Sequence, residues 1–231
     1  MLITGIEPLD KRRCKVLTDE DFAFVLYKGE AKRLGIRENA ELSESEREGI
    51  IDDILTKRAK ERALYILKGG DKTTEELRKK LSDSGYPDCV TERVLSFLSE
   101  YGLCDDRRYC STYISQKIGK LSERMIREKL RNKGISPDII RECLYKAKDS
   151  SDEDISELQK RACITAIYKK LGIRTGCDQE AISEAFAKLD EKKRASLFAA
   201  LMRKGFGAGL IKECLKEADF CTDGYQLCEE A

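Results

Sequence analysis

Four basic side chains in the middle of the chain have the spacing of one helical face. They stand at positions i, i+4, i+7 and i+11 and are Lys120, Arg124, Arg127 and Arg131. A helix that begins near Lys120 would place all of them on the same side. Ammonium and guanidinium groups in such a row bind phosphate oxygens or carboxylates. The pattern therefore predicts a binding face for nucleic acid or for an acidic protein surface.

The surrounding sequence is also basic. Lys117, Lys129 and Lys133 add nearby charge, and residues 105–148 carry 12 basic and 6 acidic side chains, although the whole chain has a net charge of only +1. A solvated helix surface is the alternative interpretation, because charge runs often mean no more than that. We take these lysines and arginines together as the candidate partner-binding or DNA-binding face, and the solvated surface stays open beside it.

Sequence signatures of enzymes are missing. The chain has no histidine, which is the commonest general base and metal ligand. It also has no GxxxxGK[ST] phosphate loop, GxSxG elbow or GxGxxG turn. The carboxylate pair Asp105 and Asp106 suits a helix N-terminus, where the helix dipole favours negative charge, and a metal role for it is the weaker alternative. We therefore expect a protein that is not an enzyme, without catalytic residues, cofactor or metal.

The 10 cysteines are scattered singly, and no CxxC pair occurs. Several fall on the apolar faces of predicted helices, and the N-terminus lacks the pattern of a secretory signal. We interpret them as reduced thiols, mostly in cores, of a cytoplasmic protein. No apolar run approaches the roughly 18 residues that a membrane-spanning helix needs, so we expect a soluble chain.

The elements that position these residues come from a repeat. An apolar skeleton with a central glycine recurs in three copies with spacings of 4, 4, 5 and 5 residues. The copies are Leu77, Leu81, Gly85, Val90 and Leu95; Ile126, Leu130, Gly134, Ile139 and Leu144; and Leu197, Leu201, Gly205, Leu210 and Leu215. Apolar residues four apart share a helix face, and the glycine supplies the positive φ of a C-cap. Each copy is therefore predicted to be a helix, a tight turn and a second helix.

A further helix before each copy completes a three-helix unit. In the first unit, Ser43 with Glu46 and Thr73 with Glu76 form capping boxes, and one long helix runs from Ser43 to the glycines 69–70. Helices are expected over 105–118, 122–133 and 137–148 in the second unit, and over 155–171, 191–204 and 208–218 in the third. Tandem repetition explains the glycine turns as architecture rather than as DNA-reading helix-turn-helix motifs.

The first residues follow a different pattern. Short β-prone runs at 1–7, 14–17 and 22–27 lie between charged turns, and a short helix is predicted over 28–34. The expected fold class is mainly α, with tandem three-helix repeats forming an elongated curved array and a small N-terminal antiparallel β-hairpin or meander. The predicted domains are a β-extension at 1–42, repeats at 43–103, 104–150 and 151–218, and an acidic C-terminal tail at 219–231.

Short motifs follow one another in a fixed order along the chain. They are KTTEEL at 72–77, LxxxLxxxGY at 77–86, YGLCDDRRYCSTYI at 101–114, LRNKGI at 130–135 and LMRKGF at 201–206. In order and spacing they resemble the RecX regulatory proteins of bacteria, and ITGIEP and DFAFVLYKGE near the N-terminus resemble the β-extension of longer members. The resemblance runs over about residues 1–218. Cys104 and Tyr109 depart from it, where a larger apolar residue and Phe are usual, and both suit a core position.

The resemblance implies a modulator of the RecA recombinase that acts in DNA repair, recombination and the SOS response. Members of the family bind the RecA filament on single-stranded DNA and suppress its ATPase and strand-exchange activities. The partners would be the RecA filament and, weakly or through the filament, single-stranded DNA. We expect a monomer without membrane contact. Two alternatives stay open: an autonomous DNA-binding helix-turn-helix protein, and a protein-interaction scaffold without nucleic-acid contact.

Overall fold

A computed structural model describes residues 1–20, 22–150, 155–173 and 185–223. By contacts between its residues the chain divides into two compact units, Met1–Asp106 and Arg107–Ala231. The start of the predicted third repeat at 151–154, part of the stretch between its first two predicted helices and the end of the predicted acidic tail lie outside the described residues.

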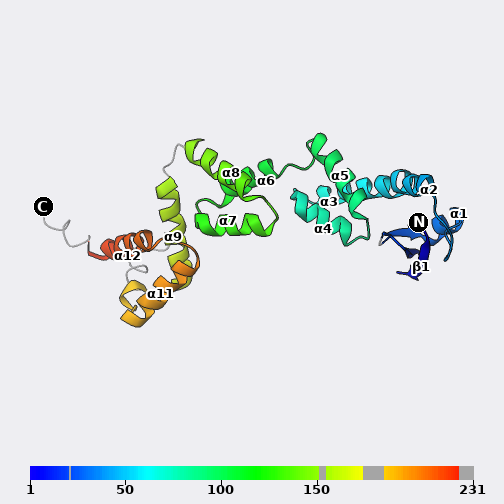
Figure 1. Ribbon diagram of the computed structural model, residues 1–231. Helices are drawn as coiled ribbons and strands as arrows, with labels where there is room; N and C mark the ends of the chain where they lie inside the picture. The colour runs from blue at the N-terminus through cyan, green and yellow to red at the C-terminus, as the bar shows by residue number, and fades with distance from the viewer. Residues whose placement is uncertain (21, 151–154, 174–184, 224–231) are drawn as a thin grey trace. The chain divides into compact units, whose positions relative to one another are not determined.

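The N-terminal unit begins with an antiparallel sheet in the order β1-β2-β3 (Figure 1). The strands are β1 (Ile3–Pro8), β2 (Arg13–Thr18) and β3 (Ala23–Tyr27). In the register of the central strand, Val16 pairs with Ile6 on one side and with Phe24 on the other. The short helix α1 (Lys28–Arg33) follows directly. The predicted meander and short helix are therefore confirmed.

A continuous helical segment comes next, made of α2 (Glu44–Gly49), η1 (Ile50–Thr56) and α3 (Lys57–Lys68). At its start the Glu46 N–H donates to the Ser43 hydroxyl at 3.3 Å, and the Ser43 N–H donates to the Glu46 carboxylate at 2.9 Å. The capping box and the long helix are confirmed. The π-helical middle, η1, was not predicted. Together η1 and α3 carry the buried apolar residues of the segment, which are Ile50, Ile51, Leu55, Ala59 and Ala63.

Helices α4 (Thr74–Ser82) and α5 (Asp88–Glu100) complete the first repeat. Buried residues of the sheet, among them Val16 and Phe24, belong to the same apolar cluster as Leu77 and Leu98 of these helices. The β-extension therefore shares one core with the first repeat, because a small sheet alone buries too little apolar surface to be stable.

The second unit holds two further sets of helices, each around its own apolar core. Helices α6 (Asp106–Lys117), α7 (Glu123–Asn132) and α8 (Pro137–Ser150) surround one core; the first residue of α6 is the last residue of the N-terminal unit. Helices α9 (Ile155–Leu171), α11 (Glu191–Arg203) and α12 (Ala208–Asp223) surround the other. The mainly α fold with three-helix repeats and a small sheet is therefore confirmed.

The three glycine turns have the predicted left-handed backbone. Gly85, Gly134 and Gly205 have φ values of 86°, 81° and 81°. After each glycine a backbone N–H reaches back to the preceding helix, as from Ile135 to the Leu130 carbonyl at 3.2 Å. This is the bond of a Schellman C-cap, which satisfies a carbonyl at the helix end.

A position that the predicted skeleton omits is also buried in each copy. In the second and third copies, Ile139 and Leu210 are only half-buried, and the next residues, Ile140 and Ile211, are the buried ones, with exposures of 1% and 0%. The corresponding residue in the first copy is Thr91, also buried at 1%. Since this position holds a threonine in one copy, an apolar pattern alone could not identify it.

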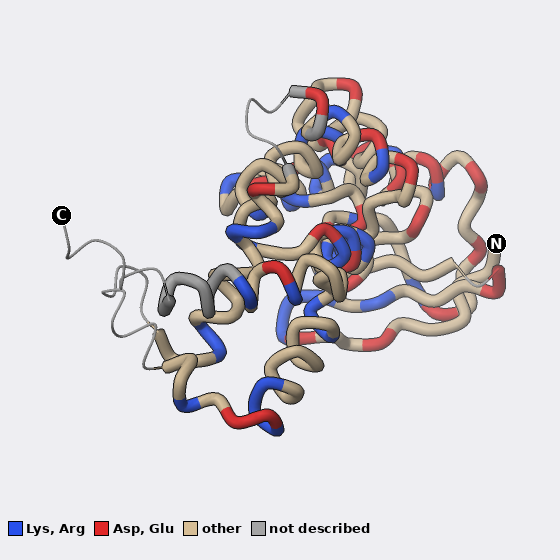
Figure 2. The backbone as a smooth tube through the Cα atoms, turned by 90° about the vertical axis from the view of Figure 1, so that its left-hand side faces the viewer, with Lys and Arg blue, Asp and Glu red and all other residues tan. Residues whose placement is uncertain are grey.

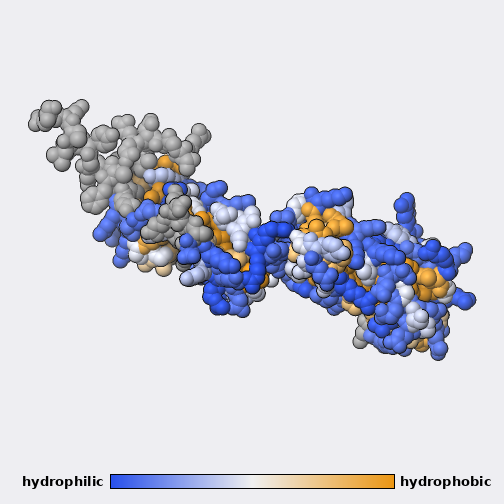
Figure 3. Space-filling model, turned by 90° about the horizontal axis from the view of Figure 1, so that it is seen from above, coloured by the Kyte–Doolittle hydropathy of each residue, from blue (hydrophilic) through white to orange (hydrophobic). Residues whose placement is uncertain are grey.

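The cysteines are mostly core residues. Cys14, Cys104, Cys110, Cys143, Cys163 and Cys214 are buried thiols outside any disulfide, whereas Cys89 is an exposed thiol. The interpretation as packed thiols is confirmed for the buried six; the side chains of Cys177, Cys221 and Cys228 are outside the described part. Within that part, we find no helix with the length and apolarity that crossing a bilayer requires. On the face shown in Figure 3 the surface is mainly hydrophilic, with apolar residues in separate patches.

Candidate functional site

The predicted basic face is divided among three segments of the second unit. Four of its members lie on α7, namely Arg124, Arg127, Lys129 and Arg131. Lys117 is the last residue of α6, Lys120 lies in the turn between the helices, and Lys133 is the C-cap of α7. Because α7 begins at Glu123, its helical spacing does not extend back to Lys120, and that step of the sequence argument is wrong.

Most of these side chains are available to a partner. Of the seven predicted residues, Lys120, Arg124, Lys129 and Arg131 are exposed and form no ion pair with any described residue. Charges of this kind have no partner to lose when they bind a phosphate or a carboxylate. Binding by them therefore does not require an existing ion pair to be broken.

Arg127 and Lys133 are engaged within the unit. The Arg127 guanidinium donates to the Glu123 carboxylate through Nη2 at 2.6 Å and Nε at 3.0 Å. Lys133 Nζ lies 5.4 Å from the centre of the Tyr109 ring, a cation–π distance. Tyr109 itself packs beside Tyr113, with ring centres 6.4 Å apart. These side chains therefore contribute to local structure as well as to the positive charge.

The beginning of α7 is held by residues distant in sequence. Ser122, its N-cap, is buried; its hydroxyl accepts from the Met125 N–H at 3.2 Å and donates to the Lys204 carbonyl. The Gln159 amide of α9 accepts from the Glu123 N–H at 3.1 Å and donates to the Ile118 carbonyl at 3.1 Å. Hence the third repeat orients the helix that carries the basic residues.

Arg124 lies against the glycine turn of the third repeat. A Cβ built on Gly205 would be 2.7 Å from Arg124 Cβ and 2.8 Å from its Cδ. The aliphatic part of the arginine therefore covers the turn, while the residue as a whole stays exposed. This contact brings two further exposed basic residues, Arg203 and Lys204, next to the start of α7. The sequence analysis missed them, although LMRKGF placed both directly before the glycine.

Acidic residues limit the positive field around α7. Glu123 and Glu128 lie on the same helix, and Figure 2 shows Asp and Glu in red interspersed with Lys and Arg in blue along the backbone. At physiological ionic strength, charges separated by more than roughly 8 Å are largely screened from each other. The face therefore offers local contacts to phosphates or carboxylates rather than a long-range field.

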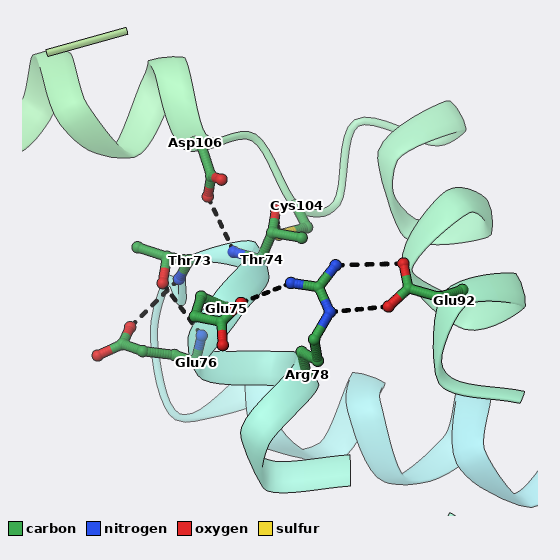
Figure 4. Close-up of polar contacts among 8 residues, drawn as sticks. All are labelled: Thr73, Thr74, Glu75, Glu76, Arg78, Glu92, Cys104 and Asp106. Carbon is green, nitrogen blue, oxygen red and sulfur yellow. Dashed lines mark hydrogen bonds and ion pairs between the residues drawn. The ribbon is translucent and has the colours of Figure 1, made fainter. Parts of the chain in front are cut away.

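Asp106 of the predicted carboxylate pair lies at the N-terminus of its own helix, α6, and also contacts the N-terminus of α4. Asp106 begins α6, and its carboxylate accepts a hydrogen bond from the Thr74 N–H, in the first turn of α4, at 2.8 Å (Figure 4). A carboxylate in this place is stabilised by the helix dipole. Beside it, Cys104 Sγ lies 3.6 Å from the Thr74 hydroxyl. Among the described residues, no group of three or more candidate ligands could hold a metal ion.

An arginine links the two helices next to this cap. Arg78 of α4 pairs with Glu75 at 2.6 Å and with Glu92 of α5 at 2.7 Å (Figure 4). Hydrogen bonds from Arg78 lower the pKa of Glu92, and the two carboxylates raise the pKa of Arg78. Both sides of this bridge are therefore charged at neutral pH, and its role is structural.

Comparison with known proteins identifies the repeats. Residues 59–98 match the family model described as "RecX, first three-helix domain", and residues 105–144 match "RecX, second three-helix domain". The chain is 32% identical over 155 residues to "Regulatory protein RecX" of Clostridium perfringens (strain SM101 / Type A), an alignment that covers 66% of this chain and 72% of the relative. It is 26% identical over 213 residues to the protein of the same name from Clostridium botulinum (strain Eklund 17B / Type B), with 92% and 93% covered.

Solved structures share the fold. One described as "Crystal structure of regulatory protein RecX" superposes with a TM-score of 0.58 at 22% identity, covering 94% of this chain and 98% of the other. Another, RecX from Lactobacillus salivarius, superposes with a TM-score of 0.54 at 19% identity, covering 71% and 97%.

Proposed function

The chain belongs to the RecX family of regulatory proteins, and on that premise we propose that it inhibits the RecA recombinase. In this proposal it binds the RecA filament on single-stranded DNA as a monomer in the cytoplasm. It suppresses the ATPase and strand-exchange activities of the filament without catalysing a reaction itself. Contact with single-stranded DNA is weak or made through the filament.

One observation supports the site of contact most directly. Basic side chains without ion pairs to described residues are gathered on α7 and the turn before it. Arg203 and Lys204 lie beside its first turn, because Arg124 packs against Gly205. A partner with phosphates or carboxylates at its surface gains charge-assisted hydrogen bonds here. Both DNA phosphates and acidic loops of a protein filament have that chemistry.

Regulation by such a protein requires different affinities for two states of its target. A ligand shifts an equilibrium only by its differential affinity for the two states. Reversing a 99:1 preference takes a difference of about 10⁴ in affinity. A single exposed ion pair contributes at most about 1 kcal/mol, so several contacts must act together. We therefore propose that the basic side chains of α7 act as a group rather than singly.

The test combines Arg124→Glu, Arg127→Glu and Arg131→Glu in one variant and measures RecA ATPase on single-stranded DNA. The expected result is a large loss of inhibition with an unchanged circular-dichroism spectrum. Arg141→Glu is the matched control, because Arg141 is exposed on α8 and pairs with Asp138 at 2.7 Å. Undiminished inhibition by the folded triple variant would refute this site. Absence of inhibition by the unaltered protein would refute the function itself.

A further inference from the structure

A groove in the N-terminal unit runs between the sheet and the first repeat. One part of it, of about 470 Å³, lies among β2, β3, α3 and the turn between α4 and α5. A second part, of about 430 Å³, shares Arg13, Ser84 and Tyr86 with the first. The two parts therefore adjoin each other, an arrangement that suits a chain-like ligand better than a single small molecule.

The groove has an excess of guanidinium groups. Arg13, Arg58 and Arg62 line its first part together with one carboxylate, that of Glu61. Arg13 pairs with Asp10 through Nε at 2.7 Å, and Arg58 pairs with Glu30 through Nη2 at 2.6 Å. Neither of these two carboxylates is part of the lining. The arginines are therefore anchored from outside the groove.

Several donors on these arginines remain for a ligand. A guanidinium has five N–H donors, and Arg13 uses only Nε in its pair with Asp10. Arg62 forms no ion pair with any described residue, and its guanidinium lies 5.8 Å from the centre of the exposed Tyr65 ring. In the second part of the groove, Lys15 adds another cation and Asp83 an acidic group.

Two tyrosines lie among the arginines. The Arg58 guanidinium lies 4.6 Å from the centre of the Tyr27 ring, which is 42% exposed. Tyr86 is half-buried, and this burial raises its pKa, so its hydroxyl keeps its proton at neutral pH. Both tyrosines line the first part of the groove together with Arg13. Aromatic rings beside cations are the arrangement in which single-stranded nucleic acids stack bases and bind phosphates.

The wall of the groove is closely packed. Gly85, in the turn between α4 and α5, lies so near β3 that an added Cβ would be 2.5 Å from Val25 Cγ2. The turn that carries Ser84 and Tyr86 is therefore fixed against the sheet that carries Arg13 and Tyr27. A preformed site of this kind loses little side-chain and loop entropy on binding.

We propose that this groove binds a single-stranded nucleic acid, with the arginines on its phosphates and the tyrosine rings against its bases. The presence of aromatic rings beside the cations, one of them exposed, favours a nucleic acid over an acidic peptide, which would use the cations alone. This contact lies in the N-terminal unit and is distinct from the basic residues of α7. It concerns direct binding of a strand and does not depend on inhibition of RecA.

The first experiment measures binding of a fluorescent oligo-dT to the full chain, without RecA, by anisotropy at several salt concentrations. Arg13→Ala and Arg62→Ala are each expected to weaken binding roughly three- to tenfold. Each is also expected to reduce the slope of log K against log salt by about 0.7, the value for one lost phosphate contact on a single strand. Arg12→Ala is the matched control, because Arg12 is exposed in the turn before β2 and outside the lining.

The second experiment uses an oligonucleotide that contains 5-iodouracil and maps photo-cross-links by mass spectrometry. Cross-links to Tyr27 or Tyr86 are expected, and a glutamate-rich peptide is expected not to displace the strand at equal charge concentration. Any of three results would overturn the proposal: no binding of oligo-dT by the unaltered protein, unchanged affinity and slope in the folded Arg13→Ala/Arg62→Ala double variant, or equal displacement by the peptide. RecA inhibition, measured separately, tests the proposed function and not this groove.

Discussion

The aliphatic part of Arg124 covers Gly205, so that a Cβ at the glycine would lie 2.7 Å from the arginine Cβ. One residue is on the second repeat and the other in the turn of the third, and Ser122 adds a hydrogen bond to the Lys204 carbonyl beside them. In the N-terminal unit, the corresponding glycine, Gly85, packs against Val25 of β3. In both cases a glycine turn is the point at which a repeat packs against the part of the chain before it.

Replacing Gly205 by alanine is expected to destabilise the second unit. The backbone at φ 81° costs a residue with a side chain about 1–2 kcal/mol, and the contact with Arg124 adds to that cost. Gly209→Ala is the control and is expected to raise the free energy of unfolding. The site is exposed on α12 and has open space around the added Cβ, and alanine stabilises a helix by about 0.5–1 kcal/mol relative to glycine. Urea denaturation followed by circular dichroism measures both. Equal effects of the two substitutions would contradict this account of the turn.

Ser122→Ala is expected to lower the free energy of unfolding by about 2 kcal/mol, because it removes an N-cap and leaves the Lys204 carbonyl without its donor. Ser136→Ala is the comparison. Its hydroxyl also accepts from a backbone N–H, that of Ile139, but at 3.4 Å and in an exposed position, so about 0.5–1 kcal/mol is expected. Hydrogen exchange should show the larger loss of protection in α7 and at the end of α11. If both variants lose the same protection, the hydrogen bond to the Lys204 carbonyl adds nothing to the stability that an N-cap alone provides.

Replacing Arg131 and replacing Arg127 on α7 are expected to have different effects on the stability of the protein. Arg131→Glu removes an exposed charge without an ion pair to a described residue, so it should weaken binding to RecA filaments severalfold and leave stability unchanged within about 0.5 kcal/mol. Arg127→Glu places a second carboxylate one helical turn from Glu123, which the arginine now neutralises at 2.6 Å, so it should also lower helix stability. Co-sedimentation with RecA filaments and thermal denaturation separate the two effects. Equal stability losses would contradict the distinction.

The bridge from Arg78 predicts a pH dependence with a definite sign. Arg78 lowers the pKa of Glu92 below its ordinary 4.5, so the stabilisation is present above that pH and is lost as the pH falls through the lowered value. Arg78→Met should therefore cost about 0.5–1 kcal/mol at neutral pH, a range that allows for solvent screening, and much less in acid. Denaturation at both pH values measures the difference. Arg141→Met, at a more exposed pair on α8, should show no such dependence.

Local features of the fold were predictable from sequence because their partners are close in the chain. The capping boxes at Ser43 and Thr73 each involve a residue three positions later. The glycine turns need only a positive φ and a carbonyl of the preceding helix. Strand and helix periods likewise follow from the order of apolar residues. This explains why the sheet and the three-helix repeats were predicted with nearly the observed bounds.

Other features depended on partners elsewhere in the chain. Lys120 was predicted on a helical face, but α7 is capped at Ser122, where Gln159 and Lys204 supply the partners of its first turn. The buried position after each glycine turn is occupied by Thr91 in one copy, which no hydrophobic pattern reveals. The groove of the N-terminal unit joins Arg13 to Tyr86, residues whose proximity follows from the packing of β3 on Gly85.

By itself, therefore, the sequence determined the kind of elements, the repeat and the presence of a basic segment, because periodicity, capping and charge are properties of neighbouring residues. Only the tertiary structure decided which basic side chains are paired, which turn covers which side chain, and where arginines and tyrosines line a common groove. Those properties arise when distant segments pack together, since packing, rather than composition, decides which charges are left exposed to a ligand.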